Sequence, residues 1–146
     1  MLGRFAELLA AEAEDCARIT TSEVGKPIVQ SRNEVRAVQE RIAWNIANVG
    51  RIIAPRVVTA DGPVEERVTC EPVGVVAHVS AWNYPYFVGL NTIVPALLAG
   101  NTVCYKPSEH ATLTGLRLVD LLHRAGVPAD AVQAVVGGGP AGAALV

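Results

Sequence analysis

Residues 73–85 read VGVVAHVSAWNYP, and the prediction of the fold starts from them. Its first half, residues 73–79, is an almost continuous run of apolar and β-branched residues, which is typical of a strand buried on both faces of a parallel sheet. Residues 86–99 have the length and pattern of a helix, and Gly100-Asn101 is a typical helix end. Pro95 lies inside this helix, so we expect it to bend or split the helix.

The same alternation repeats downstream. Residues 102–105 predict a second buried strand, residues 112–125 a second helix and residues 131–136 a third strand. Strand, helix, strand, helix and strand joined by short loops indicate the α/β class, with one βαβαβ half of a doubly wound, Rossmann-like parallel sheet. The third strand is expected to be an open, apolar edge of that sheet.

Two helices are predicted upstream of the sheet. Apolar residues recur every three or four positions in residues 4–20, and Gly25 and Pro27 end that pattern. The same spacing returns from residue 29 to about residue 53, which predicts a longer second helix. We expect the two to pair as a helical hairpin.

A β-hairpin is predicted between the helices and the sheet. Residues 56–59 form a short β-branched run, Asp61-Gly62-Pro63 is a turn signal, and residues 65–70 alternate charged and apolar side chains. The chain therefore divides into N-terminal helices (1–55), a β-hairpin (56–72) and part of a nucleotide-binding domain (73–146).

Composition narrows the function classes. The 146 residues carry 12 Lys and Arg against 14 Asp and Glu, a formal charge of −2, so no basic surface for nucleic acid is expected. The apolar runs are much shorter than the roughly 20 residues of a membrane-spanning helix, and no signal peptide fits the acidic N-terminal region. We expect a soluble protein without a membrane partner.

The cysteines and histidines favour a reducing compartment and no metal. Cys16, Cys70 and Cys104 are three in number and widely spaced, which is typical of free thiols in the cytoplasm. The three histidines are isolated in sequence, so surface or packing roles are expected for them rather than metal binding.

The carboxyl ends of parallel strands form the ligand crevice in sheets of this type. Three distinctive segments fall at such ends here, namely residues 80–85, 106–109 and 137–140. Lys106 as a donor and Glu109 as an acceptor can both reach a ribose, and the carboxylate would repel a 2'-phosphate. Gly137, Gly139 and Gly142 spell a dinucleotide-binding glycine pattern, which is a weak signal without an acidic residue about 20 positions later.

An ordered set of motifs resembles the aldehyde dehydrogenase superfamily. The set extends over nearly the whole chain but matches only the earlier part of a family member. Its motifs are Glu23-Val24-Gly25-Lys26-Pro27, Glu71-Pro72-Val73-Gly74-Val75, Trp82-Asn83-Tyr84-Pro85, Pro95-Ala96-Leu97 with Gly100-Asn101-Thr102-Val103, Lys106-Pro107-Ser108-Glu109 and Gly142-Ala143-Ala144-Leu145.

The resemblance implies a catalytic role for Asn83. In the family this asparagine donates its side-chain amide to the oxyanion of a thiohemiacetal, and a neutral donor fixed at a strand end is suited to stabilise that charge. The reaction implied is oxidation of an aldehyde to a carboxylic acid, with a nicotinamide cofactor as hydride acceptor.

The resemblance also implies a set of cofactor contacts. Trp82 would lie beside the nicotinamide ribose, while Lys106 and Glu109, with Ser108 between them, would hold the adenosine ribose. Gly139 and Pro140 would flank the adenine. Glu109 favours NAD as the cofactor, although NADP stays open, and the segment containing residues 65–70 resembles the strands through which the family forms homo-oligomers.

The residues of the chemical step are not expected in this chain. The family needs a cysteine nucleophile and a glutamate base on later segments, and Cys104 is expected to be a desolvated thiol inside a strand. The chain is therefore interpreted as the N-terminal part of an enzyme, and this part is expected to be inactive by itself. The alternatives are a non-catalytic nucleotide-binding or assembly module completed by another chain and, with less support, an unrelated Rossmann protein.

Overall fold

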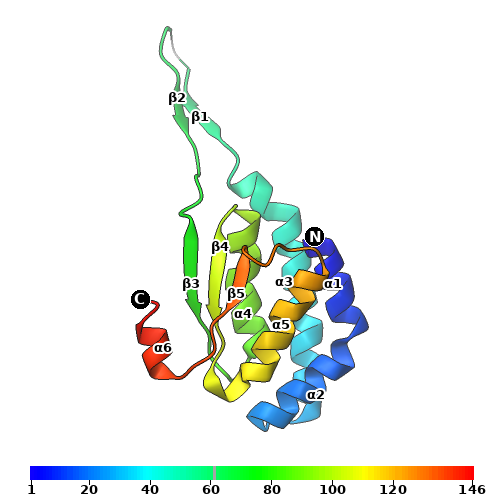
Figure 1. Ribbon diagram of the computed structural model, residues 1–146. Coiled ribbons are helices and arrows are strands. Elements are labelled where there is room, and N and C mark those ends of the chain that lie inside the picture. The colour runs from blue at the N-terminus through cyan, green and yellow to red at the C-terminus, as the bar shows by residue number, and fades with distance from the viewer. Residues whose placement is uncertain (61) are drawn as a thin grey trace.

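Three parallel strands form the sheet of the main body, with the helical layers to one side of it (Figure 1). In the computed structural model, which describes residues 1–60 and 62–146, they are β3 (Val75–Val79), β4 (Thr102–Lys106) and β5 (Val132–Ala134). Their order is β3-β4-β5, with Val75 paired to Thr102 and Tyr105 paired to Ala134. The predicted βαβαβ unit is confirmed.

The connecting helices α4 (Pro85–Leu98) and α5 (Thr112–Arg124) pack on the same face of the sheet. Both approach the ring of Tyr105 on β4 through a glycine, Gly89 on α4 and Gly115 on α5. A Cβ atom at Gly115 would lie 2.4 Å from the Cβ of Pro107, so only glycine allows α5 this close to the end of β4. Right-handed crossovers between sequentially ordered strands place both helices on one face.

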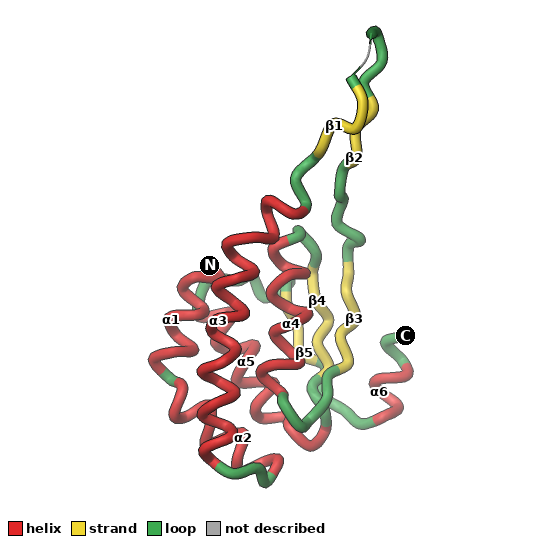
Figure 2. The backbone as a smooth tube through the Cα atoms, turned by 180° about the vertical axis from the view of Figure 1, so that it is seen from behind, coloured by secondary structure: helices red, strands yellow, loops and turns green. Residues whose placement is uncertain are grey.

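Three further helices cover the far side of α4 and α5, as Figure 2 shows from behind. They are α1 (Leu2–Ala11), α2 (Ala13–Val24) and α3 (Ile28–Ile52). One cluster of buried side chains joins the two helical layers to the sheet, from Phe5 on α1 to Val132 on β5.

The first predicted helix is two helices. The break falls at Glu12, whose backbone lies at φ −107° and ψ 19°. The carboxylate of Glu12 binds the guanidinium groups of both Arg117 and Arg124 on α5. Since these partners lie more than 100 positions away, the hydrophobic spacing of residues 4–20 could not indicate the break. Pro95 does not split α4, which is continuous from Pro85 to Leu98.

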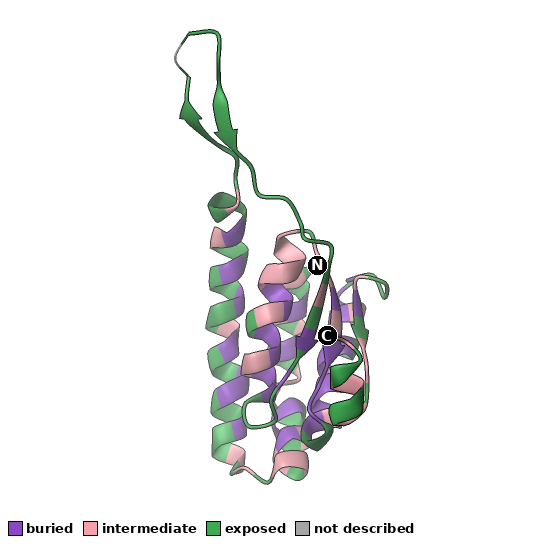
Figure 3. Cartoon of the chain, turned by 90° about the vertical axis from the view of Figure 1, so that its left-hand side faces the viewer, coloured by how far each residue is buried: buried purple, intermediate pink, exposed green. Residues whose placement is uncertain are grey.

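The predicted hairpin projects away from the body of the molecule (Figure 1). It consists of β1 (Arg56–Thr59) and β2 (Glu66–Val68), antiparallel, with Arg56 paired to Val68. Every residue of both strands is exposed, as Figure 3 shows in green. Asp61 of the predicted turn lies outside the described residues.

The prediction that residues 73–79 form a strand buried on both faces is wrong for β3. Only His78 is buried in it, while Val75 and Val79 are 72% and 49% exposed. The reason is that β3 lies at an edge of the sheet and α4 and α5 cover only one face. The predicted edge strand β5 is an edge as well, but its Val132 is fully buried.

No helix in the described part of the chain combines the length and apolar character needed to cross a membrane. Among residues 1–60 and 62–146, no group of three or more His, Cys, Asp or Glu side chains is placed to hold a metal ion.

Candidate active site

The carboxyl ends of the three strands lie side by side, as the sequence predicts. The backbone N–H of Ser80, just after β3, donates to the carbonyl of Lys106 at 2.9 Å, and the N–H of Val135 donates to the carbonyl of Tyr105 at 2.8 Å. The loops that follow β3, β4 and β5 therefore leave the sheet at one edge, where parallel α/β sheets bind their ligands.

The first loop carries Trp82 and Asn83, both of which are exposed. It ends at Pro85, the first residue of α4, where proline suits the helical backbone and no N–H is needed. The carbonyl of Asn83 accepts a hydrogen bond from Nζ of Lys26 at 3.0 Å. Lys26 thus holds the backbone of this turn, while the side chains of Trp82 and Asn83 remain exposed.

His110 lies beside Trp82, a neighbour that the sequence did not indicate. The two ring centroids are 6.5 Å apart and the rings are nearly perpendicular, at 85°. With Glu23 and Val24 they line a shallow pocket of about 330 Å³. An isolated histidine has no sequence pattern that reveals this contact, because the partner comes from a different strand end.

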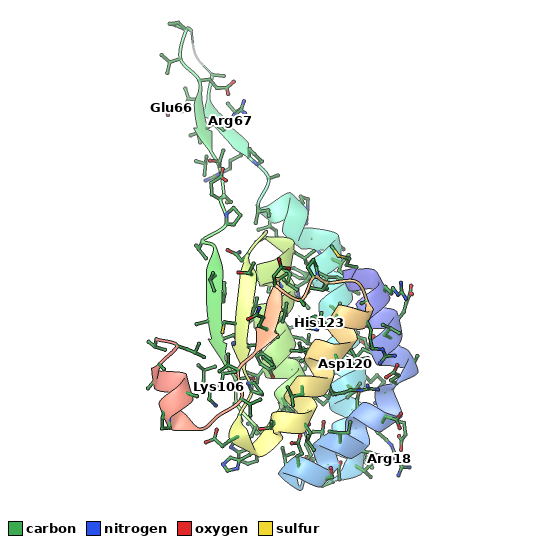
Figure 4. All side chains as sticks on the ribbon, viewed as in Figure 1. Arg18, Glu66, Arg67, Lys106, Asp120 and His123 are labelled. Atoms are coloured by element: carbon green, nitrogen blue, oxygen red, sulfur yellow. The ribbon has the colours of Figure 1, made fainter. Side chains whose placement is uncertain are left out.

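The second loop places Lys106 and Glu109 together. Lys106 is buried at the end of β4, near α6 (Gly139–Ala143) (Figure 4). Its Nζ donates to the carbonyl of Pro107 at 3.1 Å and lies 3.5 Å from Oε2 of Glu109. The carboxyl of Glu109 is half-exposed, and its pKa is lowered. The main cause is a hydrogen bond from the backbone N–H of Glu109 itself, and the positive charge of Lys106 lowers the pKa further. The pair presents a donor and an ionised acceptor at the crevice.

Ser108 is buried and has a local structural role. Its Oγ accepts a hydrogen bond from the backbone N–H of His110 at 3.3 Å, which caps the short 3₁₀ helix η1 (Glu109–Ala111). This cap orders the turn that carries Glu109. The cofactor contact predicted for Ser108 stays a prediction.

The third loop runs beside the second. A Cβ atom built on Gly138 would lie 4.0 Å from Oε1 of Glu109, and one built on Gly142 would lie 3.6 Å from the Lys106 side chain. At Gly137, a Cβ atom would lie 2.6 Å from the Cβ of Ala141, so a side chain there would collide with the first turn of α6. The predicted cofactor residues Gly139 and Pro140 begin this short helix.

Two more charged side chains approach these loops without having been singled out as site residues. Glu23 accepts hydrogen bonds from the backbone N–H groups of Leu113 and Thr114, both at 2.6 Å, and so caps α5. Glu34, buried on α3, binds the first turn of α4 and pairs with Lys26. Glu23 and Lys26 belong to a motif quoted above, whereas nothing in the helical pattern around Glu34 distinguished it.

None of the three thiols lies in the three crevice loops, residues 80–85, 106–109 and 137–140. Cys16 is buried in the helical layer, where burial raises the pKa of its thiol, and Cys70 is exposed beyond the hairpin. Cys104 lies within β4, as predicted, but it is only half-buried. The expected desolvation is incomplete because the face of the sheet opposite α4 and α5 is largely uncovered.

Known proteins resemble this chain along its full length. A sequence model described as "Aldehyde dehydrogenase family" matches residues 1–146. An N-succinylglutamate 5-semialdehyde dehydrogenase of Sphingopyxis alaskensis is 37% identical over 144 residues, which are 99% of this chain and 30% of that protein. An NADP/NAD-dependent aldehyde dehydrogenase of Escherichia coli is 35% identical over 147 residues, covering 99% of this chain and 30% of the relative.

Solved structures agree with the sequence comparison. The aldehyde dehydrogenase of Brucella melitensis biovar abortus superposes with a TM-score of 0.91 at 34% identity, covering 99% of this chain and 30% of that one. An NAD-dependent aldehyde dehydrogenase from Sinorhizobium meliloti gives a TM-score of 0.92 at 31% identity, covering 99% and 29%. The chain thus spans about 30% of the length of the curated relatives it matches, and it belongs to the aldehyde dehydrogenase family.

Proposed function

We propose that these 146 residues supply the oxyanion donor and part of the cofactor site of an enzyme that oxidises an aldehyde to a carboxylic acid with NAD. One observation carries the proposal: the loops of Trp82-Asn83 and Lys106–Glu109 meet at the carboxyl edge of one parallel sheet. Both loops belong to motifs that the family shares.

The residues of the second and third loops suit a nicotinamide dinucleotide. A buried lysine and an ionised carboxylate within 3.5 Å of each other offer complementary partners to ribose hydroxyl groups. The glycines of residues 137–139 keep the neighbouring backbone free of side chains, which allows a flat base to approach. A nicotinamide cofactor bound here would accept the hydride of the oxidation.

The proposed role of Asn83 is to donate its side-chain amide to the oxygen of the aldehyde. When a thiolate adds to the carbonyl carbon, the carbonyl oxygen gains negative charge, and a fixed N–H donor stabilises that charge more than it stabilises the aldehyde. The thiolate and the base that activates water for thioester hydrolysis would come from residues outside this chain. Trp82 is proposed to lie along the nicotinamide ribose.

Assembly and location are proposed on separate grounds. The fully exposed β1 and β2 hairpin supports a homo-oligomer, since unpaired strand edges are usually covered by a partner. Three free cysteines support a cytoplasmic location. The division of the chain into residues 1–55, 56–72 and 73–146 is proposed as a division of roles, with the hairpin serving assembly.

A second candidate function is an assembly or nucleotide-binding module completed by another chain. The exposed valines of β3 favour it, because a parallel edge strand of this composition is normally covered by further protein. Reading the coding sequence downstream of Val146 separates the two. A continuing frame with a cysteine and a glutamate in family context supports the enzyme, whereas a stop codon with a separate partner gene supports the module.

The enzyme proposal is tested with the polypeptide that includes this chain and its downstream sequence. We expect NAD reduction with an aldehyde as the varied substrate. Absence of reduction with short, long and aromatic aldehydes alike would contradict the proposal.

Glu109→Gln in that polypeptide should raise the ratio of NADP to NAD activity about tenfold. The substitution removes one negative charge near the 2'-phosphate of NADP, and it weakens the hydrogen bond to the ribose of NAD. The measurement is kcat/KM for each cofactor at fixed aldehyde concentration. Asp130→Asn, which removes the same charge from an exposed loop outside the crevice, is the matched control. An unchanged ratio in Glu109→Gln would refute the assignment.

A further inference from the structure

A buried ion pair lies beneath the turn that carries Asn83. Glu34 projects from α3 with its side chain fully buried, and the side chain of Lys26, in the loop between α2 and α3, is 9% exposed. Nζ of Lys26 binds Oε2 of Glu34. Burying two opposite charges this completely is costly unless each makes further hydrogen bonds, so their other contacts indicate what the pair does.

The carboxylate of Glu34 holds the start of α4. Its Oε1 accepts hydrogen bonds from the backbone N–H groups of Tyr86 and Phe87 at 2.8 and 3.1 Å. The first N–H groups of a helix have no partner within the helix, and the residue before α4, Tyr84, supplies no side-chain cap. A residue 52 positions earlier therefore fixes where α4 begins.

The ammonium group of Lys26 holds the residues just before α4. Nζ donates to the carbonyl of Asn83 at 3.0 Å and lies 4.1 Å from the centroid of the Tyr84 ring. Together, Lys26 and Glu34 contact the backbone on both sides of Pro85. The Asn83 turn is thus fixed at its carbonyl and at the following helix, while its side chain remains exposed.

The pair also sets the charge beneath Asn83. A lone carboxylate at this position would oppose negative charge developing nearby on a substrate oxygen, because such repulsion is weakly screened near a protein interior. Lys26 neutralises Glu34, so the start of α4 is capped without a net negative charge. Both effects, geometric and electrostatic, favour an oxyanion next to Asn83.

We propose that Lys26 and Glu34 are positioning residues that fix the oxyanion donor Asn83 for the transition state. This inference rests on the proposed function as far as the oxyanion is concerned. The fixing of the turn is a property of the chain itself, and it is tested without any catalysis.

The first test uses the 146-residue chain labelled with ¹⁵N. In the unmodified chain the backbone order parameter of Asn83 should be close to the value of about 0.85 found for rigid segments. Lys26→Met should lower it toward about 0.6, because the hydrogen bond to the Asn83 carbonyl is lost. Glu12→Gln, which weakens ion pairs between α5 and the α1–α2 break, is the matched control and should leave Asn83 unchanged.

A second variant covers the case in which Lys26→Met does not fold, since that change leaves the Glu34 charge buried and unpaired. Lys26→Met/Glu34→Gln buries no charge and keeps an acceptor for the two amides of α4. It should show the same loss of order at Asn83. An order parameter unchanged from that of the unmodified chain, in either folded variant, would overturn the proposal.

The second test measures aldehyde oxidation by the polypeptide with its downstream sequence. Lys26→Met should lower kcat about ten- to a hundredfold, since small displacements of a reacting group have effects of this size. The KM for NAD should change less than about twofold, and Lys26→Arg, which keeps the charge, should restore part of kcat. A purely structural role would instead move the melting temperature without this split between kcat and KM.

Combining Lys26→Met/Glu34→Gln with Asn83→Ala makes the test specific, because no unpaired Glu34 carboxylate is then left to oppose the oxyanion. If Lys26 and Glu34 act through Asn83, the triple variant should be no slower than Asn83→Ala alone. Multiplicative losses would overturn the inference. A normal kcat in Asn83→Ala would instead refute the proposed function, and the order parameter of Asn83 would still decide whether Lys26 and Glu34 hold the turn.

Discussion

Asn83→Ala is expected to lower kcat for aldehyde oxidation by roughly a hundred- to a thousandfold in the polypeptide that includes this chain and its downstream sequence. The side-chain amide of Asn83 lies in the exposed part of the loop after β3, and the backbone carbonyl of Asn83 is held by Lys26. Loss of a fixed donor to a developing oxyanion has effects of this size because water in the vacated space must reorganise around the charge. Steady-state kinetics with a single aldehyde and saturating NAD give the value.

The matched control is Asn48→Ala, which removes an amide near the C-terminal end of α3, where it hydrogen-bonds Trp44 and Arg51 of the same helix. Its kcat should stay within about twofold of the unmodified polypeptide, as expected of a surface change remote from the crevice. The KM for NAD should be nearly unchanged in Asn83→Ala, since the amide acts on the aldehyde oxygen. A kcat for Asn83→Ala within about threefold of the control would refute the oxyanion role.

The 146 residues by themselves are expected to give no aldehyde oxidation with NAD or NADP. The described thiols lie in the helical layer, beyond the hairpin and within β4, and none follows a strand at the crevice edge. Without a thiolate placed opposite Asn83, no thiohemiacetal can form there. Spectrophotometric assay of NADH formation over hours, with short, long and aromatic aldehydes, makes the measurement.

Cys104→Ser distinguishes the ways in which this expectation could fail. Its half-buried thiol on β4 is the one nearest the sheet edge where Lys106 ends the strand. Turnover that disappears in Cys104→Ser would show that this thiol reacts. Turnover that survives the substitution would show that a different group performs the chemistry and that the assignment of roles is wrong.

Local sequence patterns predicted most of the architecture, because alternating apolar and helical segments reflect contacts within each element. The strand of residues 102–105 and the helix of residues 112–125 lie within one residue of β4 and α5. The shared location of the three loops could also be predicted, since the carboxyl ends of parallel strands lie at the same side of the sheet.

Features set by distant contacts were not predictable in this way. The break at Glu12 depends on Arg117 and Arg124, and the burial of Glu34 depends on the unpaired amides at the start of α4. The exposure of β3 has a different cause: its composition fits a covered strand, but no local pattern says whether the covering layer belongs to the same 146 residues.

In the candidate site too, residues within motifs were predicted, whereas contacts between distant segments were not. The motifs indicated Trp82, Asn83, Lys106 and Glu109 because these residues lie in recognisable segments. They did not indicate His110 beside Trp82, or the cap that Ser108 forms on η1, because both contacts depend on the path of the loop after β4. The support beneath Asn83 was also not predicted, although Lys26 lay within a quoted motif.

The carboxyl ends of β3, β4 and β5 are proposed to form a nicotinamide dinucleotide site, and this proposal is tested by titration of the ¹⁵N-labelled 146-residue chain with NAD. We expect binding in the millimolar range, with saturable shifts at the Trp82 indole N–H and at the backbone amides of Lys106, Ser108, Glu109 and Gly139. The amides of the hairpin, including Arg67, should not respond. Saturable shifts confined to other surfaces, or no saturable shift at any of these five residues at millimolar NAD, would contradict the proposed cofactor site.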